Sequence, residues 1–370
     1  MKKKKKIFAV SDIHGHCSAL KKALEEAGFI ANDESCILIV CGDCFDRGSE
    51  NKEVFDYLNT IQNKIIIRGN HEDMLEMLLD AKHMSHGGFS NGMDRTLRDF
   101  FGPRVIGSID INYQFSYRLH FEEKQDVVRE LQTFINNTYD YFETEHYVFT
   151  HGWLPATVDE NYNCSVDEDF RYAQPASWYR ARFAEWYRMY GAGAMLKGKT
   201  IVCGHRASRF CCLLGEQRDP EDYSSFFAEG LAAIDGSTFH SGKVNVLVVE
   251  DEVICSETQT MSLHPEPFDK IKSGEKRVEL RLFDEKRKKL HVGDRIVFTN
   301  TENETETLAV TVIGLHVYRN FDSVLRNFPA RDLGFEDGVT SIEGRMLSYY
   351  SHEDMTKNGV LAIRIVPENS

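Results

Sequence analysis

Carboxylate, amide and imidazole side chains, the groups that hold metal ions, gather in five short segments of this chain. The segments are Ser11–Gly15, Gly42–Gly48, Gly69–Glu72, Thr150–Gly152 and Gly204–His205. Asp12 and His14 are two residues apart, so in extended chain their side chains leave the same face and can reach one cation. Asp43 supplies a carboxylate that can bridge that cation to a second one.

Neutral donors would complete the second cation site. These are the amide of Asn70 and the imidazoles of His151 and His205. Mixed nitrogen and oxygen donors without a thiolate suit Mn, Fe or Zn better than Ca or Mg. Two cations about 3.5–4 Å apart can hold a hydroxide between them and clamp the oxygens of a phosphoryl group. We therefore expect two divalent ions, Mn²⁺ first with Fe or Zn as alternatives, and attack on a phosphoester by the metal-bridging hydroxide.

Four further polar residues in or beside these segments are not assigned as metal ligands. His71 follows Asn70 and would face the leaving-group oxygen, where an imidazole can donate a proton at neutral pH. Asp46 would orient that imidazole and keep it protonated. Arg47 and Arg68 offer planar donor forks that match phosphoryl oxygens. We predict an acid pair and two phosphate-binding arginines.

The elements that position these side chains are predicted to be buried strands. Each segment follows a short apolar run rich in β-branched residues. The runs are Ile7–Val10, Ile37–Cys41, Ile65–Ile67, Tyr147–Phe149 and Ile201–Cys203. In an α/β sheet the ligand crevice lies outside the carboxyl ends of the strands, so loops distant in sequence converge there.

The phrases Gly42–Gly48 and Arg68–Glu72 resemble the metallo-dependent phosphoesterases, and within them the phosphoprotein phosphatase branch. This branch includes bacterial and phage serine/threonine phosphatases and symmetrical dinucleoside tetraphosphate hydrolases. The resemblance spans about residues 7–255. It implies the same metal ligands, acid pair and phosphate-binding arginines, and a calcineurin-like β-sandwich flanked by helices. Two departures are Ser11, where the branch commonly has Gly, and Arg206, where it usually has Thr.

Two stretches of this region have no ligand motif. Between Lys82 and His146 lies a block with a predicted helix at about Glu122–Phe142, which would either roof the site and select substrates or form a packed insert. Trp178–Tyr187 has apolar residues at helical spacing, which favours core packing, with Arg180 or Arg182 as a possible further phosphate contact.

Composition indicates an ordinary protein of 370 residues, with 42% hydrophobic residues and a net charge of −14. No apolar run approaches the length of a membrane span, so we expect no membrane partner. The basic run Lys2–Lys6 leads into only four apolar residues, too few for a signal peptide. We therefore expect a cytoplasmic location, and we interpret the basic run as a solvated tail.

A domain boundary is predicted after a strand at Val244–Val249. The prolines of Leu263–Pro267 are expected to break any regular element there. We expect a metallophosphoesterase domain at 1–260 and a second domain at 263–370. From Leu263 onward the chain has 16 Lys and Arg against 18 Asp and Glu, so nearly all the acidity precedes it.

Short strands at Arg295–Thr299, Thr307–Gly314 and Gly359–Val366, with one helix near Phe321–Asn327, favour a small β-barrel. The stretch Ile271–Arg281, with Gly293-Asp294 and Tyr349-Tyr350, resembles an ASCH domain, a relative of the PUA fold, over about residues 263–368. That resemblance implies RNA or nucleotide binding in a cleft lined by Lys276, Glu279 and Arg281. A structural salt-bridge cluster at the barrel mouth is the alternative.

The fold class is therefore α/β, a calcineurin-like phosphoesterase sandwich with a smaller PUA-like β-barrel. The first functional interpretation is a phosphatase that hydrolyses phosphomonoesters, foremost phosphoserine and phosphothreonine in proteins. One alternative is hydrolysis of dinucleoside polyphosphates or RNA-linked phosphates, with the ASCH-like domain binding nucleotide or RNA. An alternative from another class is an RNA-binding regulator with a vestigial metal site, against which the complete ligand list argues.

Overall fold

The computed structural model describes residues 3–110, 116–160 and 163–368, and its contacts divide them into two compact units. Unit 1 comprises Met1–Val166 and Tyr179–Ile254, and unit 2 comprises Asp167–Trp178 and Cys255–Ser370. The sequence analysis divided the chain at 260–263, and this division stays a prediction. It did not anticipate that Asp167–Trp178 would group with the C-terminal residues.

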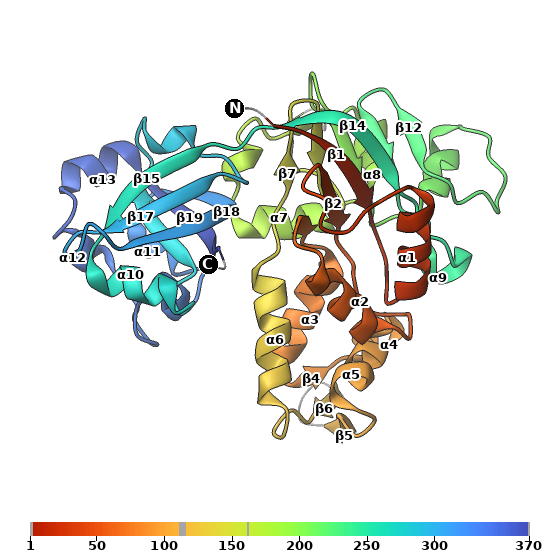
Figure 1. Ribbon diagram of the computed structural model, residues 1–370, viewed down its shortest axis with the longest axis horizontal. Helices are drawn as coiled ribbons and strands as arrows, with labels where there is room; N and C mark the ends of the chain where they lie inside the picture. The colour runs from red at the N-terminus through yellow and green to blue at the C-terminus, as the bar shows by residue number, and fades with distance from the viewer. Residues whose placement is uncertain (1–2, 111–115, 161–162, 369–370) are drawn as a thin grey trace. The chain divides into compact units, whose positions relative to one another are not determined.

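Unit 1 is built on two sheets (Figure 1). The first has the order β14-β1-β2-β3, with β14 Leu247–Ile254, β1 Lys3–Val10, β2 Cys36–Cys41 and β3 Lys64–Ile67. The second has the order β12-β13-β11-β8-β7, with β12 Phe226–Ala228, β13 Leu231–Ala233, β11 Thr200–Cys203, β8 Tyr147–Phe149 and β7 Phe142–Glu143. All five strands expected before the polar segments are confirmed.

The first sheet is buried on both faces, which explains its continuous apolar runs. Ile7 and Ala9 pack with side chains of the second sheet, such as Phe149 and Val202. Phe8, on the opposite face of β1, packs with the helices. The β1–β2 and β2–β3 pairs are parallel, and so is the β8–β11 pair.

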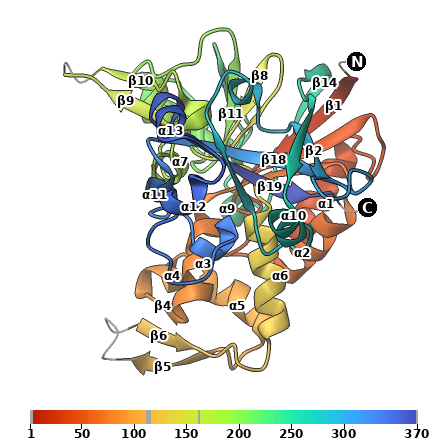
Figure 2. The ribbon, with the colours of Figure 1, turned by 90° about the vertical axis from the view of Figure 1, so that its left-hand side faces the viewer.

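The helices of unit 1 are α1 Cys17–Glu26, α2 Asn51–Thr60, α3 Asn70–Ala81, α4 His86–Ser90, α5 Met93–Phe101, α6 Gln125–Asn136, α8 Trp186–Gly191 and α9 Thr238–Ser241. Two small sheets add β4 His83–Met84, β6 Ser116–Leu119 and β5 Ile106–Asp110, and β9 Ala156–Val158 with β10 Cys164–Val166. In both Figure 1 and Figure 2 the block from α4 to α6 lies at one end of unit 1, away from β14.

Several predicted bounds in unit 1 were wrong. The helix expected at Glu122–Phe142 is limited to α6, and the last strand runs from Leu247 to Ile254 and not from Val244 to Val249. The single helical stretch expected at Trp178–Tyr187 is interrupted between α7 (Pro175–Arg182) and α8. Lys3–Lys6 belong to β1 and are not a solvated tail, because Lys3–Lys5 pair with β14 and Lys6 pairs with Cys36 of β2; Lys2 lies outside the described residues.

Unit 2 has a five-stranded sheet in the order β15-β17-β18-β19-β16. The strands are β15 Thr258–Leu263, β17 Arg295–Asn300, β18 Thr307–Tyr318, β19 Val360–Pro367 and β16 Val278–Leu282. Its helices are α10 Pro265–Lys272, α11 Phe321–Val324, α12 Glu343–Met346 and α13 His352–Asn358, with short 3-10 turns at Arg287–Lys289 and Ala330–Leu333.

Two expectations for unit 2 were wrong. The prolines at the predicted boundary do not break regular structure, because Pro265 begins α10, where its missing N–H is not needed. The one helix expected near Phe321–Asn327 is the short α11, and three other α-helices surround it in sequence. The predicted α/β class is nevertheless confirmed: two packed sheets flanked by helices are followed by a smaller unit with one five-stranded sheet.

The segment Asp167–Trp178 is held in unit 2 by named contacts. The Tyr172 hydroxyl donates to the carbonyl of Lys288 at 3.0 Å, and the Tyr172 ring lies 4.9 Å from that of Phe283. The buried imidazole of His316 lies 2.7 Å from the Ala173 carbonyl. Among the described residues, no helix combines the length and apolarity needed to cross a bilayer.

Candidate metal centre

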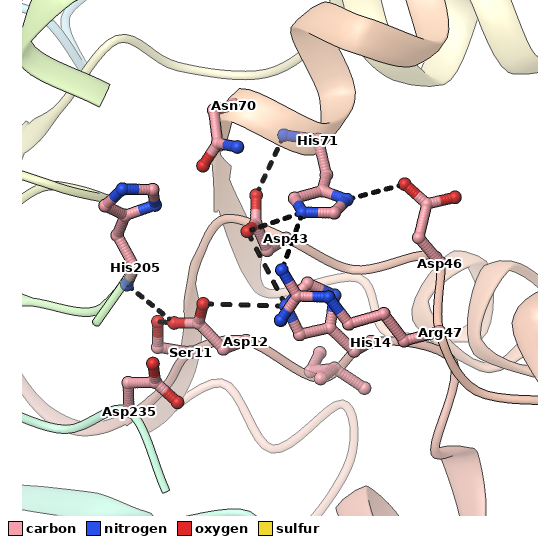
Figure 3. Close-up of polar contacts among 12 residues, drawn as sticks. Ser11, Asp12, His14, Asp43, Asp46, Arg47, Asn70, His71, His205 and Asp235 are labelled. Atoms are coloured by element: carbon pink, nitrogen blue, oxygen red, sulfur yellow. Dashed lines mark hydrogen bonds and ion pairs between the residues drawn. The ribbon is translucent and has the colours of Figure 1, made fainter. Parts of the chain in front are cut away.

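The predicted metal ligands converge where the parallel strands of unit 1 end. Asp12 and His14 follow β1, Asp43 follows β2, and Asn70 begins α3 after β3. His151 and His205 follow β8 and β11 of the second sheet. Figure 3 shows the Asp12, Asp43, Asn70 and His205 side chains facing one space. The site therefore lies at the carboxyl ends of strands from both sheets.

Asp43 occupies the centre of this cluster. Its Oδ2 atom lies 3.7 Å from His14 Nε2, and its Oδ1 atom lies 3.3 Å from His151 Nε2. Candidate ligand atoms form two groups that share this carboxylate, one of Asp43 with His14 and His71 and one of Asp43 with His151 and His205. A carboxylate common to two groups is the arrangement that two neighbouring cations require.

The remaining ligands border these groups. Asp12 lies on the His14 side, with Oδ1 3.8 Å from His14 Nε2, and its Oδ2 accepts the His205 backbone N–H at 2.9 Å. Asn70 lies on the other side, with Oδ1 2.9 Å from His151 Nε2. The structure thus brings together all six residues that were predicted as ligands.

Backbone carbonyls orient two of the imidazoles. His14 Nδ1 lies 2.9 Å from the Phe45 carbonyl, and His151 Nδ1 lies 2.7 Å from the Cys41 carbonyl. Because a carbonyl can only accept, each Nδ1 donates to its carbonyl, and Nε2 is the ring nitrogen that faces the site. Metal-binding histidines are held in the same way by partners on the opposite ring nitrogen.

The ring nitrogens that face the site fit a cation. Nε2 of His14 and Nε2 of His205 are buried and have no hydrogen-bond partner within the described part of the chain. Burial lowers the pKa of His14 well below its ordinary value, and burial with the nearby His151 lowers that of His205 to about 3. Both imidazoles are therefore neutral, the form that coordinates a metal ion.

Asp43 stays ionised in spite of its burial. Burial alone would raise its pKa, but the imidazoles of His151 and His71 hold the net pKa below the usual value. Asp12 differs, because its burial raises its pKa. A cation bound between these carboxylates would favour the charged form of both.

The acid pair is also assembled. His71 Nδ1 lies 2.7 Å from Asp46 Oδ2, and His71 Nε2 lies 3.1 Å from Arg47 Nη2. Burial of the imidazole lowers the pKa of His71, but the carboxylates of Asp43 and Asp46 outweigh burial and raise it overall. The hydrogen bond to Asp46 directs the Nε2 edge of the ring toward the cluster (Figure 3).

The two predicted phosphate-binding arginines are placed differently. Arg47 extends its guanidinium into the cluster beside His71. Arg68 is buried, and its Nε donates to Asp73 at 2.6 Å while Nη2 donates to Glu76. Arg182 binds Asp73 as well, at 2.5 Å. Arg68 is thus tied to α3, whereas Arg47 reaches the cluster.

Sequence reasoning assigned no role to three residues that support the site. Glu72 is buried and accepts the backbone N–H groups of Asp43, Cys44 and Gly69 at 2.8–2.9 Å, so it joins the loops that follow β2 and β3. Its position at N3 of α3 is a capping signal that could have identified it. The Ser11 hydroxyl donates to the Asp12 carboxylate.

Asp235 is the third of these residues. It lies beside Ser11 and Asp12 in Figure 3 and follows β13, a strand that was not predicted. Burial, and then the Asp12 carboxylate, raise the pKa of Asp235 well above its usual value. The apolar run before Asp235 has the same strand-end pattern as the recognised segments.

Backbone strain concentrates at the predicted site. Ten described residues other than glycine have positive φ angles, and six of them are predicted site residues. The six are Asp12, His14, Asp43, Asp46, Arg47 and His205, with φ between 48° and 75°. Such conformations cost about 1–3 kcal/mol each and persist where the surrounding structure enforces them, which is frequent in active sites.

The predicted cluster of unit 2 is assembled too. Glu279 is 4% exposed; its carboxylate lies 2.7 Å from Lys276 Nζ and 2.9 Å from Arg281 Nε. Glu279 Oε2 and Arg281 Nε have no hydrogen-bond partner among the described residues, whereas Arg281 Nη2 donates to the Ser262 carbonyl at 2.8 Å. These residues border a cavity of about 660 Å³ whose lining also includes His264, Lys270, Phe335, Arg345, Tyr349 and Tyr350.

Comparisons with known proteins match both units. The family model of calcineurin-like phosphoesterases matches residues 5–229, and that of the ASCH domain matches residues 261–368. Over 83 residues, 22% of this chain, it is 41% identical to a serine/threonine-protein phosphatase 2 of Salmonella typhimurium. Over 66 residues, 18% of the chain, it is 35% identical to a symmetrical bis(5'-nucleosyl)-tetraphosphatase of Buchnera aphidicola.

These matches are partial. The chain spans 35% of the length of the first relative and 23% of the second. A solved structure from Pyrococcus furiosus is 33% identical, with a TM-score of 0.25, and the match covers 31% of this chain and 99% of that one.

Proposed function

Because the chain belongs to the calcineurin-like phosphoesterase family, we propose that it is a metal-dependent phosphatase whose substrates are phosphoserine and phosphothreonine in proteins. The observation that carries this proposal is the pair of ligand groups that share Asp43. Members of the family hydrolyse phosphoesters at a binuclear metal centre. Phosphoester hydrolysis therefore rests on the family and the ligand groups. What we propose beyond it is that the substrates are phosphorylated proteins.

The donor set favours Mn²⁺, with Fe or Zn as alternatives, because it mixes imidazole, amide and carboxylate groups. Asp12, His14 and Asp43 would hold one ion, and Asp43, Asn70, His151 and His205 the other. When bound, such ions lower the pKa of water and neutralise phosphoryl oxygens.

Arg47 and His71 would act on the substrate in sequence. A guanidinium can only donate, so Arg47 Nη2 donates to His71 Nε2 across 3.1 Å. A phosphoryl group would attract the donor fork of Arg47 and leave His71 Nε2 free to carry a proton. Asp46 is bonded to Nδ1 and favours the protonated imidazole, which can give its Nε2 proton to the leaving oxygen.

Arg68 contributes to this function from a distance. Its donors bind Asp73 and Glu76, so we propose that it holds α3, and with it Asn70 and His71, in place. The position of Arg47 beside His71 favours Arg47 as the main phosphate-binding arginine.

The test is hydrolysis by Mn²⁺-loaded protein of a phosphoserine peptide and a dinucleoside tetraphosphate, measured side by side. We expect turnover of the peptide at the higher kcat/KM and its loss in His71→Asn. Preference for the nucleotide would instead support the second candidate below. Hydrolysis of neither substrate, with metal bound, would contradict the phosphatase proposal.

A second candidate is hydrolysis of dinucleoside polyphosphates or RNA-linked phosphates, with RNA or nucleotide bound by unit 2. The cavity of unit 2 favours it, because aromatic rings beside cationic side chains suit bases and phosphates. Binding of a fluorescent oligoribonucleotide to the full chain tests this. We expect Arg281→Met to weaken binding and Asp43→Asn to leave it unchanged; equal binding by both variants would contradict a role for this cavity.

A further inference from the structure

Helix α5, in the block that the sequence analysis left without a role, contacts the loop of the acid pair directly. The Thr96 hydroxyl, on this helix, is fully buried and accepts the backbone N–H of Asp46 at 2.9 Å. The same hydroxyl donates to Asp46 Oδ1. Asp46 Oδ2 is left to accept from His71 Nδ1. Within the described part of the chain, each carboxylate oxygen of Asp46 thus has one side-chain partner.

This loop needs external support. Asp46 and Arg47 are consecutive residues with φ of 75° and 63°, a conformation that non-glycine residues adopt only under constraint. The carbonyl of Gly92, just before α5, accepts the Arg47 N–H at 3.3 Å, and Arg95 donates to the Arg47 carbonyl. Asn51 Oδ1 provides a second acceptor for the Asp46 N–H at 2.8 Å.

These contacts distinguish Thr96 from its neighbours. Gly92 and Arg95 hold only the backbone of the loop, whereas Thr96 also holds the carboxylate that orients His71. A carboxylate fixed at one oxygen cannot rotate away from the imidazole bonded to its other oxygen. The direction of His71 Nε2 toward a leaving group therefore depends on the Thr96 hydroxyl.

We propose that Thr96 is a positioning residue for proton donation, acting through Asp46 on His71. The inference rests on the proposed phosphoester hydrolysis. It assigns the block between Lys82 and His146 a part in catalysis and not only in packing. Hydrolysis of phenyl phosphate should depend strongly on Thr96, because its leaving group is poor. Hydrolysis of p-nitrophenyl phosphate should depend on it much less, because its leaving group departs with little help from an acid.

The experiment compares Thr96→Val, which removes the hydroxyl at nearly constant volume, with Thr96→Ser, which retains it. In Mn²⁺-loaded protein we expect Thr96→Val to lower kcat for phenyl phosphate about ten- to hundredfold, the range for a lost hydrogen bond to a charged group. The kcat for p-nitrophenyl phosphate should change less than about threefold. Thr96→Ser should restore most of the phenyl phosphate activity.

Two controls separate positioning from stability. Thr144 is equally buried, and its hydroxyl also accepts a backbone N–H, that of Tyr147 at 3.2 Å. Thr144→Val should lower the unfolding temperature without changing the ratio of the kcat values for the two substrates. In a His71→Asn background, Thr96→Val should cause no further loss on phenyl phosphate, because the donor on which it acts is already absent.

The outcomes distinguish this inference from its premise. If the wild type is active but Thr96→Val lowers kcat equally for both esters, the role of Thr96 is overturned and the proposed function stands. The same holds if Thr96→Val lowers kcat for phenyl phosphate as much in the His71→Asn background as in the wild type. A metal-loaded wild type that hydrolyses neither ester overturns the proposed function and this inference with it.

Discussion

Two buried clusters of charge, one in each unit, differ in how their charges are matched. In unit 2, the Glu279 carboxylate lies within 3 Å of both Lys276 and Arg281, so the cluster is matched internally. In unit 1, carboxylates and neutral imidazoles surround one space, and Nε2 of His14 and His205 lack hydrogen-bond partners among the described residues. We therefore expect the first cluster to stabilise its own fold and the second to be completed by bound cations.

Of the variants that test this comparison, Asp43→Asn should have the largest effect on activity. It removes the carboxylate shared by both ligand groups, so we expect hydrolysis to fall to background and metal content to fall with it. Metal analysis and phosphoester assays check this. Asp56→Asn, at an exposed position on α2, is the matched control and should leave both unchanged. Full activity of Asp43→Asn would contradict the shared-ligand site.

His71→Asn should lower kcat for a poor leaving group about 10²- to 10⁴-fold, the usual contribution of a general acid. The metal content should stay at the wild-type level, because His71 is assigned to proton transfer although it lies within reach of His14 and Asp43. Elemental analysis beside the kinetic assay separates these roles. Loss of one metal ion in this variant would make His71 a ligand.

Glu279→Gln tests the cluster of unit 2. Removal of one partner from a buried ion pair costs about 3–5 kcal/mol, so we expect unit 2 to unfold at lower denaturant concentration. Glu285→Gln, which breaks an exposed pair with Lys288, should cost less than about 1 kcal/mol. Equal stability of the two variants would indicate that the Glu279 cluster is not structural.

The contribution of Glu279 to stability should also depend on pH. Burial alone would raise the pKa of Glu279, but Lys276 and Arg281 outweigh it and hold the folded-state pKa below 4.5. The unfolded state then binds more protons, so the contribution of Glu279 is complete above pH 4.5 and is lost as the pH falls through the folded-state value. Denaturant unfolding from pH 7 to pH 3 should show a smaller acid-induced loss in Glu279→Gln than in wild type.

Metal removal should destabilise the protein less than Glu279→Gln does, and its effect should be confined to unit 1. At a concentration of 100 times Kd, a metal that binds only the folded state stabilises it by about 2.7 kcal/mol. Hydrogen exchange after chelation should therefore rise in peptides that contain Asp12 or Asp43 and stay constant in peptides around Glu279. An equal rise in both units would contradict a metal site limited to unit 1.

The strands and the convergence of the ligands could be predicted because both depend on local signals. Ile37–Cys41 is apolar throughout, as a strand buried on both faces must be, and Asp43 lies two residues after its end. Parallel strands bring their carboxyl ends to one edge, so the order of motifs was enough to place Asp12 beside Asp43.

The remaining features depend on contacts between distant residues, which leave no periodic signal. Thr96 lies 50 residues from its partner Asp46, and nothing in its own neighbourhood marks it. Arg68 adjoins a ligand segment, but the carboxylates of α3 compete for its donors. The segment around Tyr172 joins unit 2 through partners more than 100 residues away.

The most direct test of the shared-ligand site is titration of metal-free protein with Mn²⁺, followed by electron paramagnetic resonance. We expect two ions per chain with the spin coupling of neighbours about 3.5–4 Å apart. Coupling should be absent in Asp43→Asn. Binding of a single ion, or of two uncoupled ions, to the wild-type chain would contradict a binuclear centre built on Asp43.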